Sequence, residues 1–137
     1  MFTLYEVGTT KDVQLEDGST RRYISIDGGM SDNIRPALYG AEYFAQLANR
    51  TSSAASVSSR IVGKHCETGD ILIRSIDLPA DIAPGDLIAM PATGAYGYAM
   101  ASNYNRVPRP PVIAISEGRS RVIVRRETEG DLLALDI

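Results

Sequence analysis

Residues 13–26 read VQLEDGSTRRYISI, two runs of strand-forming side chains on either side of Asp17-Gly18. Aspartate and glycine tolerate the positive φ that a tight hairpin turn requires, so this stretch predicts two antiparallel strands with the turn at Asp17-Gly18. Pro84-Gly85 and Glu117-Gly118 punctuate later runs in the same way. The hairpin therefore sets the pattern that we expect along the rest of the chain.

Short runs rich in Val, Ile and Tyr recur between Gly, Pro and Asp residues along the chain. Such runs are typical of strands. Their regular spacing favours a barrel or sandwich over an open parallel sheet, which would need long crossover helices. We therefore predict one all-β domain over residues 1–137, with strands at residues 4–7, 22–26, 71–76, 86–90, 112–115, 121–125 and 132–135.

Three segments depart from the strand pattern. Pro36 fixes φ and suits the first turn of a short helix, which would place Arg35 and Tyr39 one turn apart on one face. The alanine-rich residues 95–101 predict a second single helical turn. Residues 51–59 are rich in Ser and Ala, and this composition predicts a mobile loop without catalytic residues.

The composition excludes several kinds of partner. A net charge of -3 and a pI near 5.1 provide no cationic field for nucleic acid or anionic lipid. No stretch approaches the roughly 20 uninterrupted apolar residues that a membrane helix requires. With one cysteine, one histidine and no leader-like start, we expect no internal disulfide, no metal site and a cytoplasmic location.

Cys66, in His65-Cys66-Glu67-Thr68-Gly69-Asp70, is the first candidate for chemistry. A thiol is mostly protonated at neutral pH, so it can donate a proton to a carbanion. A single cysteine in a strand is also commonly a small buried apolar residue, and the residues alone favour that alternative. His65 is expected at the surface or at a strand end, facing away from Cys66 because neighbours on a strand point to opposite faces.

Three other side chains are candidates for binding. Arg35 and Tyr39 offer a planar fork and a phenol that together can clamp a carboxylate, although the residues alone favour a routine exposed cation for Arg35. Tyr96 stands in Gly94-Ala95-Tyr96-Gly97, whose small residues let a planar group approach the backbone. Such a glycine pair alone indicates only a tight turn.

These motifs, together with Asp27-Gly28-Gly29-Met30, the stretch RPALYGA at residues 35–41 and Asn103-Tyr104-Asn105, resemble the C-terminal barrel domain of the diaminopimelate decarboxylase family over nearly the whole chain. The resemblance implies a Greek-key-like β-barrel of the alanine racemase C-terminal type. It also implies a strand over residues 42–49, where local propensity alone favours a helix. The Asn103-Tyr104-Asn105 stretch would be a structural closing loop.

The resemblance implies a role for each candidate residue. Cys66 would protonate the carbon that loses carbon dioxide, and Glu67, otherwise a solvated surface charge, would hold the far amino group of the substrate. Arg35 and Tyr39 would hold the distal carboxylate, which favours meso-diaminopimelate over the substrates of related diamine-precursor decarboxylases. Tyr96 would contact both pyridoxal phosphate and the substrate.

Pyridoxal phosphate chemistry requires an imine-forming lysine and a phosphate-binding site. In the family, the lysine and the phosphate-binding loops belong to a preceding (β/α)₈ domain. Neither Lys11 nor Lys64 lies in a sequence of that kind. We therefore expect the (β/α)₈ domain to be absent and the chain to be inactive alone. The complete enzyme would form L-lysine and carbon dioxide as a homodimer with its active site at the interface. The alternatives are a free-standing amino-acid-binding module and a structural or regulatory dimerisation domain.

Overall fold

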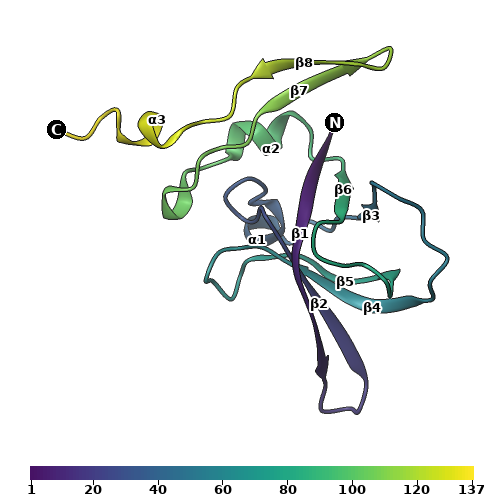
Figure 1. Ribbon diagram of the computed structural model, residues 1–137. Helices are drawn as coiled ribbons and strands as arrows, with labels where there is room; N and C mark the ends of the chain where they lie inside the picture. Colours follow the sequence, from purple (N-terminus) through teal and green to yellow (C-terminus); the bar gives the residue numbers. More distant parts are fainter.

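The computed structural model describes the backbone of residues 1–137 and every side chain except that of Ala95. A curled six-stranded sheet carries a two-stranded hairpin and four short helical segments (Figure 1). The strands are β1 (Phe2–Gln14), β2 (Thr20–Ile26), β3 (Gln46–Leu47), β4 (Ser56–Val62), β5 (Ile71–Pro79), β6 (Leu87–Pro91), β7 (Val112–Ser116) and β8 (Arg119–Val124). The helical segments are α1 (Arg35–Tyr39), α2 (Gly94–Met100), the 3-10 turn η1 (Tyr104–Arg106) and α3 (Glu129–Leu133).

The long strand β1 organises the main sheet, whose order is β3-β6-β1-β2-β4-β5. Its first half pairs antiparallel with β6 and its second half with β2, with a shift of register between Val7 and Thr10. β2 pairs in parallel with β4, which returns antiparallel to β5. Because β1 passes from one part of the sheet to the other, the sheet curls into a half barrel (Figure 1). The all-β prediction is confirmed.

The predicted turns are present where the sequence placed them. Gln14 pairs with Thr20 across the first hairpin, and Gly18 has a φ of 82°. Glu117-Gly118 joins β7 to β8 with φ values of 51° and 72°. In this second turn both central residues have positive φ, which matches the twist of antiparallel strands, whereas in the first turn Gly18 has it and Asp17 does not. These turns follow from local residue chemistry and need no tertiary contact.

The core is a single cluster of apolar side chains from alternate positions of the main sheet and its connections, as expected for strands with one buried face. Its members are Tyr5, Val7, Ile24, Ile26, Ala45, Ile61, Leu72, Ile73, Leu78, Ile82, Ile88 and Met90. Burying a side chain such as Ile contributes about 1.5–3 kcal/mol. Among the described side chains, none from the β7–β8 hairpin belongs to this core, so the main sheet is the stable platform of the molecule.

The strand predicted at residues 132–135 is wrong, because the helix α3 extends to Leu133. Thr128 and Asp131 form a reciprocal capping box at its start: the backbone N–H of Asp131 donates to the Thr128 hydroxyl, and that of Thr128 donates to the Asp131 carboxylate. Such a box satisfies two otherwise free N–H groups and favours a helical turn. A four-residue leucine-rich run fits either structure, and the cap selects the helix.

Two further predictions are only partly correct. The loop expected at residues 51–59 ends at residue 55, since β4 begins at Ser56. Ser59 is fully buried, and its hydroxyl is satisfied by donating to the backbone carbonyl of Val57 at 3.0 Å. Of residues 42–49, only Gln46–Leu47 form a strand, and the helix favoured by local propensity does not form.

Candidate functional site

Cys66 and Glu67 lie on the loop of residues 63–70 between β4 and β5, and not on a strand as the sequence suggested. The Cys66 thiol is free and exposed. The alternative in which this cysteine is buried packing is therefore wrong. His65 turns inward and is 8% exposed, so the surface position expected for the histidine is also wrong, and the buried imidazole contrasts with the exposed thiol of its neighbour.

Asp70 holds this loop against the turn at residues 27–32. Its side chain is 2% exposed and accepts hydrogen bonds from the backbone N–H of His65 at 2.8 Å and of Met30 at 2.7 Å. Glycine allows the two backbones to come this close: a Cβ on Gly63 or Gly29 would lie 2.1 or 2.7 Å from a carboxylate oxygen of Asp70. One buried acid therefore fixes the backbone that presents the exposed thiol.

Glu67 is oriented by Tyr104, which belongs to η1. The Tyr104 hydroxyl donates a hydrogen bond to Oε1 of Glu67. This bond, together with the negative charge of Glu67, raises the pKa of the Tyr104 phenol. The resemblance assigned the Asn103-Tyr104-Asn105 stretch a structural role alone, so the contact between Tyr104 and Glu67 was not predicted from the sequence. The only signal was an aromatic residue between two turn-forming asparagines.

α1 carries Arg35 and Tyr39 one turn apart, as predicted. Pro36 occupies the first helical turn, and Gly40 ends the helix in a left-handed conformation with a φ of 64°. Arg35 Nη1 lies 3.5 Å from the hydroxyl of Tyr43, and none of the ion pairs found among the described side chains includes Arg35. Tyr39 is 65% exposed. A guanidinium and a phenol are thus available to an incoming carboxylate.

Tyr96 lies on α2, the predicted second helical segment, and is 72% exposed. The chain after α2 returns to the site, because the backbone N–H of Ser102 donates to the carbonyl of Ser31 at 2.8 Å. The structure therefore joins η1 and the 27–32 turn to the Cys66 loop. Among the described side chains, no hydrogen bond connects Tyr96, or the α1 pair, to that loop.

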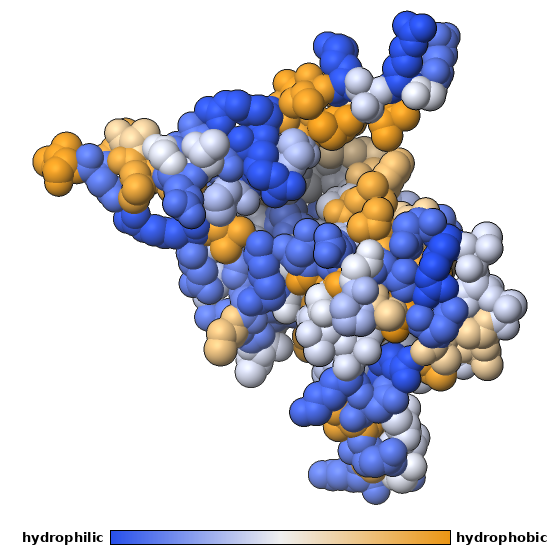
Figure 2. All heavy atoms as spheres, in the orientation of Figure 1, coloured by the Kyte–Doolittle hydropathy of each residue, from blue (hydrophilic) through white to orange (hydrophobic). Residues whose placement is uncertain are grey.

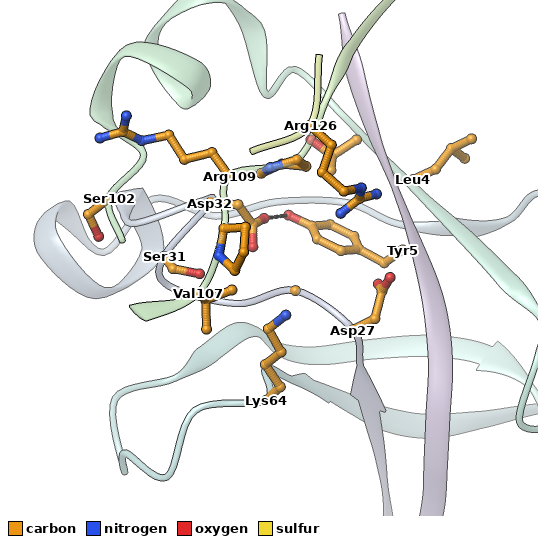
Figure 3. Close-up of a pocket in the computed structure, with 14 residues that line it drawn as sticks. Leu4, Tyr5, Asp27, Ser31, Asp32, Lys64, Ser102, Val107, Arg109 and Arg126 are labelled. Atoms are coloured by element: carbon orange, nitrogen blue, oxygen red, sulfur yellow. Dashed lines mark hydrogen bonds between the residues drawn. The ribbon is translucent and has the colours of Figure 1, made fainter. Parts of the chain in front are cut away.

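A small polar cavity lies beside the loop, between the 27–32 turn and residues 107–110 (Figure 3). Asp32 accepts hydrogen bonds in it from the Tyr5 hydroxyl at 2.5 Å and from the N–H of Gly29 at 2.7 Å. Burial raises the pKa of Asp32, and burial together with the neighbouring Asp32 raises the pKa of Tyr5. Lys64 points toward the cavity (Figure 3). The cavity has a volume of about 70 Å³, which accommodates a few water molecules and nothing as large as a cofactor.

A larger groove of about 580 Å³ runs between the start of β1, α2 and the β7–β8 hairpin. Apolar side chains dominate its walls and include Phe2, Leu4, Tyr98, Pro110, Ile113, Ile115 and Ile123. Several of them are exposed, Ile115 to 66% and Ile123 to 57%. Figure 2 shows apolar side chains gathered on this face near the hairpin. Because none of the described side chains of the hairpin belongs to the core cluster, this face lacks the packing of the main sheet, and a two-stranded hairpin alone is only marginally stable.

Among the described residues, no group of three or more His, Cys, Asp or Glu side chains is arranged to hold a metal ion. In the part of the chain that the structure describes, no helix has the length and apolar character needed to cross a membrane.

The fold and site define a β-rich domain that presents a thiol, a carboxylate and phenols on its surface rather than inside a closed pocket. Residues 1–94 match the family model described as pyridoxal-dependent decarboxylase, C-terminal sheet domain, and the chain belongs to this family. It is similar to the diaminopimelate decarboxylase of Mycobacterium tuberculosis, with 57% identity over 98% of this chain and 30% of that protein. The corresponding enzyme of Bacillus subtilis is 51% identical over the same shares of the two chains.

Solved structures agree with the sequence comparisons. Diaminopimelate decarboxylase from Helicobacter pylori, complexed with L-lysine, superimposes with a TM-score of 0.84 and 32% identity, over 98% of this chain and 31% of that one. The chain thus spans about 30% of the length of the curated relatives that it matches.

Pyridoxal phosphate is the cofactor that the family implies. An imine-forming lysine and a phosphate grip would have to surround it. Lys11 lies on β1, and Lys64 lies beside the small polar cavity, which has no room for the cofactor. The larger groove has room, but neither lysine is among the residues that line it. The described residues therefore do not form a pyridoxal phosphate site of their own. They offer side chains that can face such a site from outside.

Proposed function

We propose that residues 1–137 form the C-terminal domain of a diaminopimelate decarboxylase, which converts meso-diaminopimelate to L-lysine and carbon dioxide with pyridoxal phosphate. The observation that carries the proposal is the 57% identity over 98% of the chain to an enzyme of that name. The exposed thiol of Cys66 beside Glu67 supports it. A preceding (β/α)₈ domain would supply the lysine and the phosphate grip, and the chain alone would be inactive.

Cys66 is the proposed proton donor. Its thiol is exposed at the surface of the domain, on a loop whose backbone is fixed by the buried Asp70. In the complete enzyme the sulfur would donate its proton to the carbon atom from which the carboxylate has left. A group with a firm backbone and an accessible sulfur suits this role, because proton transfer requires hydrogen-bond reach in a defined direction.

The substrate would be held by opposite charges at its far end. Diaminopimelate carries an amino and a carboxylate group at each end, so the end that does not react needs both an acidic and a basic partner. Glu67 is the proposed partner of the amino group, and Arg35 with Tyr39 is the proposed partner of the carboxylate. A substrate without the distal carboxylate would leave Arg35 uncompensated, which is costly once the site closes. Tyr96 would face both cofactor and substrate.

The complete enzyme is proposed to be a cytoplasmic homodimer with its active sites at the subunit interface. The exposed thiol of Cys66 supports a site that lies outside this domain, and the membership of the decarboxylase family favours the partner subunit as the place of that site. The loop of one subunit would then face the cofactor of the other. Symmetric dimers of this kind expose identical surfaces to each other, so both loops would be used.

The test compares the complete enzyme with variants in the Cys66 loop. Cys66→Ala should lower kcat by about 10²–10⁴-fold, the range for general acids, with unchanged cofactor absorbance. Thr68→Ala, an exposed residue of the same loop, is the matched control and should keep the wild-type rate. A normal rate of carbon dioxide release from Cys66→Ala would refute the acid role. Carbon dioxide release by the 137-residue chain alone would refute the proposed incomplete site.

A further inference from the structure

The hydrogen bond between Tyr104 and Glu67 joins segments that are 37 residues apart in the sequence. We propose that Tyr104 is the positioning residue for Glu67: its hydroxyl fixes one carboxylate oxygen, so that the other oxygen faces the ammonium group of the substrate. This inference rests on the proposed function, in which Glu67 holds the amino group farthest from the reacting carbon.

Glu67 needs such a partner because it is exposed on a loop. A glutamate side chain with free rotation samples many rotamers, and each productive contact must then overcome that entropy. Tyr104 removes part of this freedom by holding Oε1. A carboxylate has lone pairs on both oxygens, so Oε2 keeps its capacity to accept hydrogen bonds from an ammonium group.

Tyr104 is itself held in place from behind. Its ring packs edge-on against the His65 imidazole, with centroids 5.3 Å apart and an interplanar angle of 84°. His65 is buried, and its Nε2 lies 2.9 Å from the hydroxyl oxygen of Ser31. Ser31 in turn accepts at its carbonyl from the N–H of Ser102, two residues before Tyr104. The buried histidine thus gains a role as support for the phenol.

The electrostatics keep Tyr104 in the form that donates. The neighbouring Glu67 carboxylate raises the pKa of the phenol, so the hydroxyl stays protonated across the neutral range. Glu67 in its charged form is the acceptor of this hydrogen bond and is also the form that attracts an ammonium group. The same ionisation state therefore serves both contacts.

The kinetic test uses the complete enzyme with Tyr104→Phe, Glu67→Ala and the double variant, because alanine removes the oxygen that accepts from Tyr104. Tyr104→Phe should lower kcat/KM for meso-diaminopimelate by about tenfold, mainly through KM, because one hydrogen bond to a charged group is lost while the reacting centre is unchanged. The double variant should be no worse than Glu67→Ala, since Tyr104 acts only through Glu67. Tyr98→Phe, which also removes one exposed phenol, should leave kcat/KM within about twofold of wild type.

Multiplicative losses in the double variant would overturn the proposal, because they would mean that Tyr104 contributes independently of Glu67. A loss confined to kcat would overturn it as well. The contact itself is tested in the 137-residue chain by ultraviolet titration, taking the difference between wild type and Tyr104→Phe. The Tyr104 phenol should titrate above its ordinary range and return toward that range in Glu67→Gln. If Tyr104 titrates normally in the wild type, the positioning role fails. If the complete enzyme shows no activity on diaminopimelate, the proposed function fails first.

Discussion

Gly63→Ala should strongly destabilise the loop that carries Cys66, whereas Gly69→Ala in the same loop should not. A Cβ on Gly63 would lie 2.1 Å from Oδ2 and 2.4 Å from Cγ of Asp70. Around Gly69 the corresponding position is open, with no heavy atom within 4 Å and no left-handed φ. The pair therefore separates the effect of one steric contact from the general effect of adding a methyl group.

The size of the effect follows from the bonds that Asp70 has to give up. Ordinary contact with the new methyl group begins at 3.4 Å, so the carboxylate must retreat by more than an ångström. Its hydrogen bonds to the N–H of Met30 at 2.7 Å and of His65 at 2.8 Å then break. A hydrogen bond to a charged group contributes about 1.5–3 kcal/mol, so losing both bonds should lower the unfolding free energy by about 3–6 kcal/mol.

Urea unfolding of the 137-residue chain, followed by circular dichroism, measures both variants. Gly63→Ala should lower the midpoint without changing the m-value. Gly69→Ala should stay within about 0.5 kcal/mol of wild type or gain slightly, because alanine restricts the unfolded chain. Equal unfolding free energies of the two variants would refute the reasoning, since Asp70 would then not be packed against Gly63.

Three further outcomes are expected. Arg50 binds both carboxylate oxygens of Asp86, at 2.8 and 2.7 Å, and holds the pKa of that carboxyl well below its usual range. The stabilisation is therefore complete well above the unfolded pKa of about 3.9 and is lost as the pH falls through and below that value. The difference in unfolding free energy between wild type and Asp86→Asn should stay constant from pH 7 to about pH 5 and narrow from there to pH 2; a difference that stays constant down to pH 2 would contradict this. The exposed Cys66 should react with Ellman's reagent without urea, and strong protection relative to the unfolded chain would disprove its accessibility. Gly118→Ala, at a φ of 72°, should cost about 1–2 kcal/mol and speed amide exchange in the β7–β8 hairpin alone, whereas faster exchange in the core of the main sheet would show that the two parts unfold together.

The elements that the sequence predicts well are those whose cause is local. The turn at Asp17-Gly18 needs only residues that accept positive φ, and the start of α1 needs only the fixed φ of Pro36. β4 is different, because it pairs in parallel with β2 and buries Ser59. Its serines indicate a loop until the parallel partner, far away in the sequence, is in place. Local propensity could not supply that information.

The site follows the same division. The motif predicts Cys66 and Glu67 as site residues, and the structure shows that the thiol is exposed; their roles stay predictions. The contact of Tyr104 with Glu67 arises from the return of the chain after α2. The anchoring role of Asp70 could not be predicted from the sequence either, because its partners are backbone N–H groups, which every residue except proline has. Contacts of this kind become visible only when distant segments meet.

Asp70 holds the loop only through hydrogen bonds from backbone N–H groups, and this affects which loop residues can change. The anchor recognises only the path of the backbone, so the residues between His65 and Gly69 can change their chemistry without altering the platform beneath them. A different proton donor at position 66, or a shorter side chain at position 67, would alter what the surface recognises while leaving the sheet intact. The loop residues can thus vary while the backbone beneath them keeps its path.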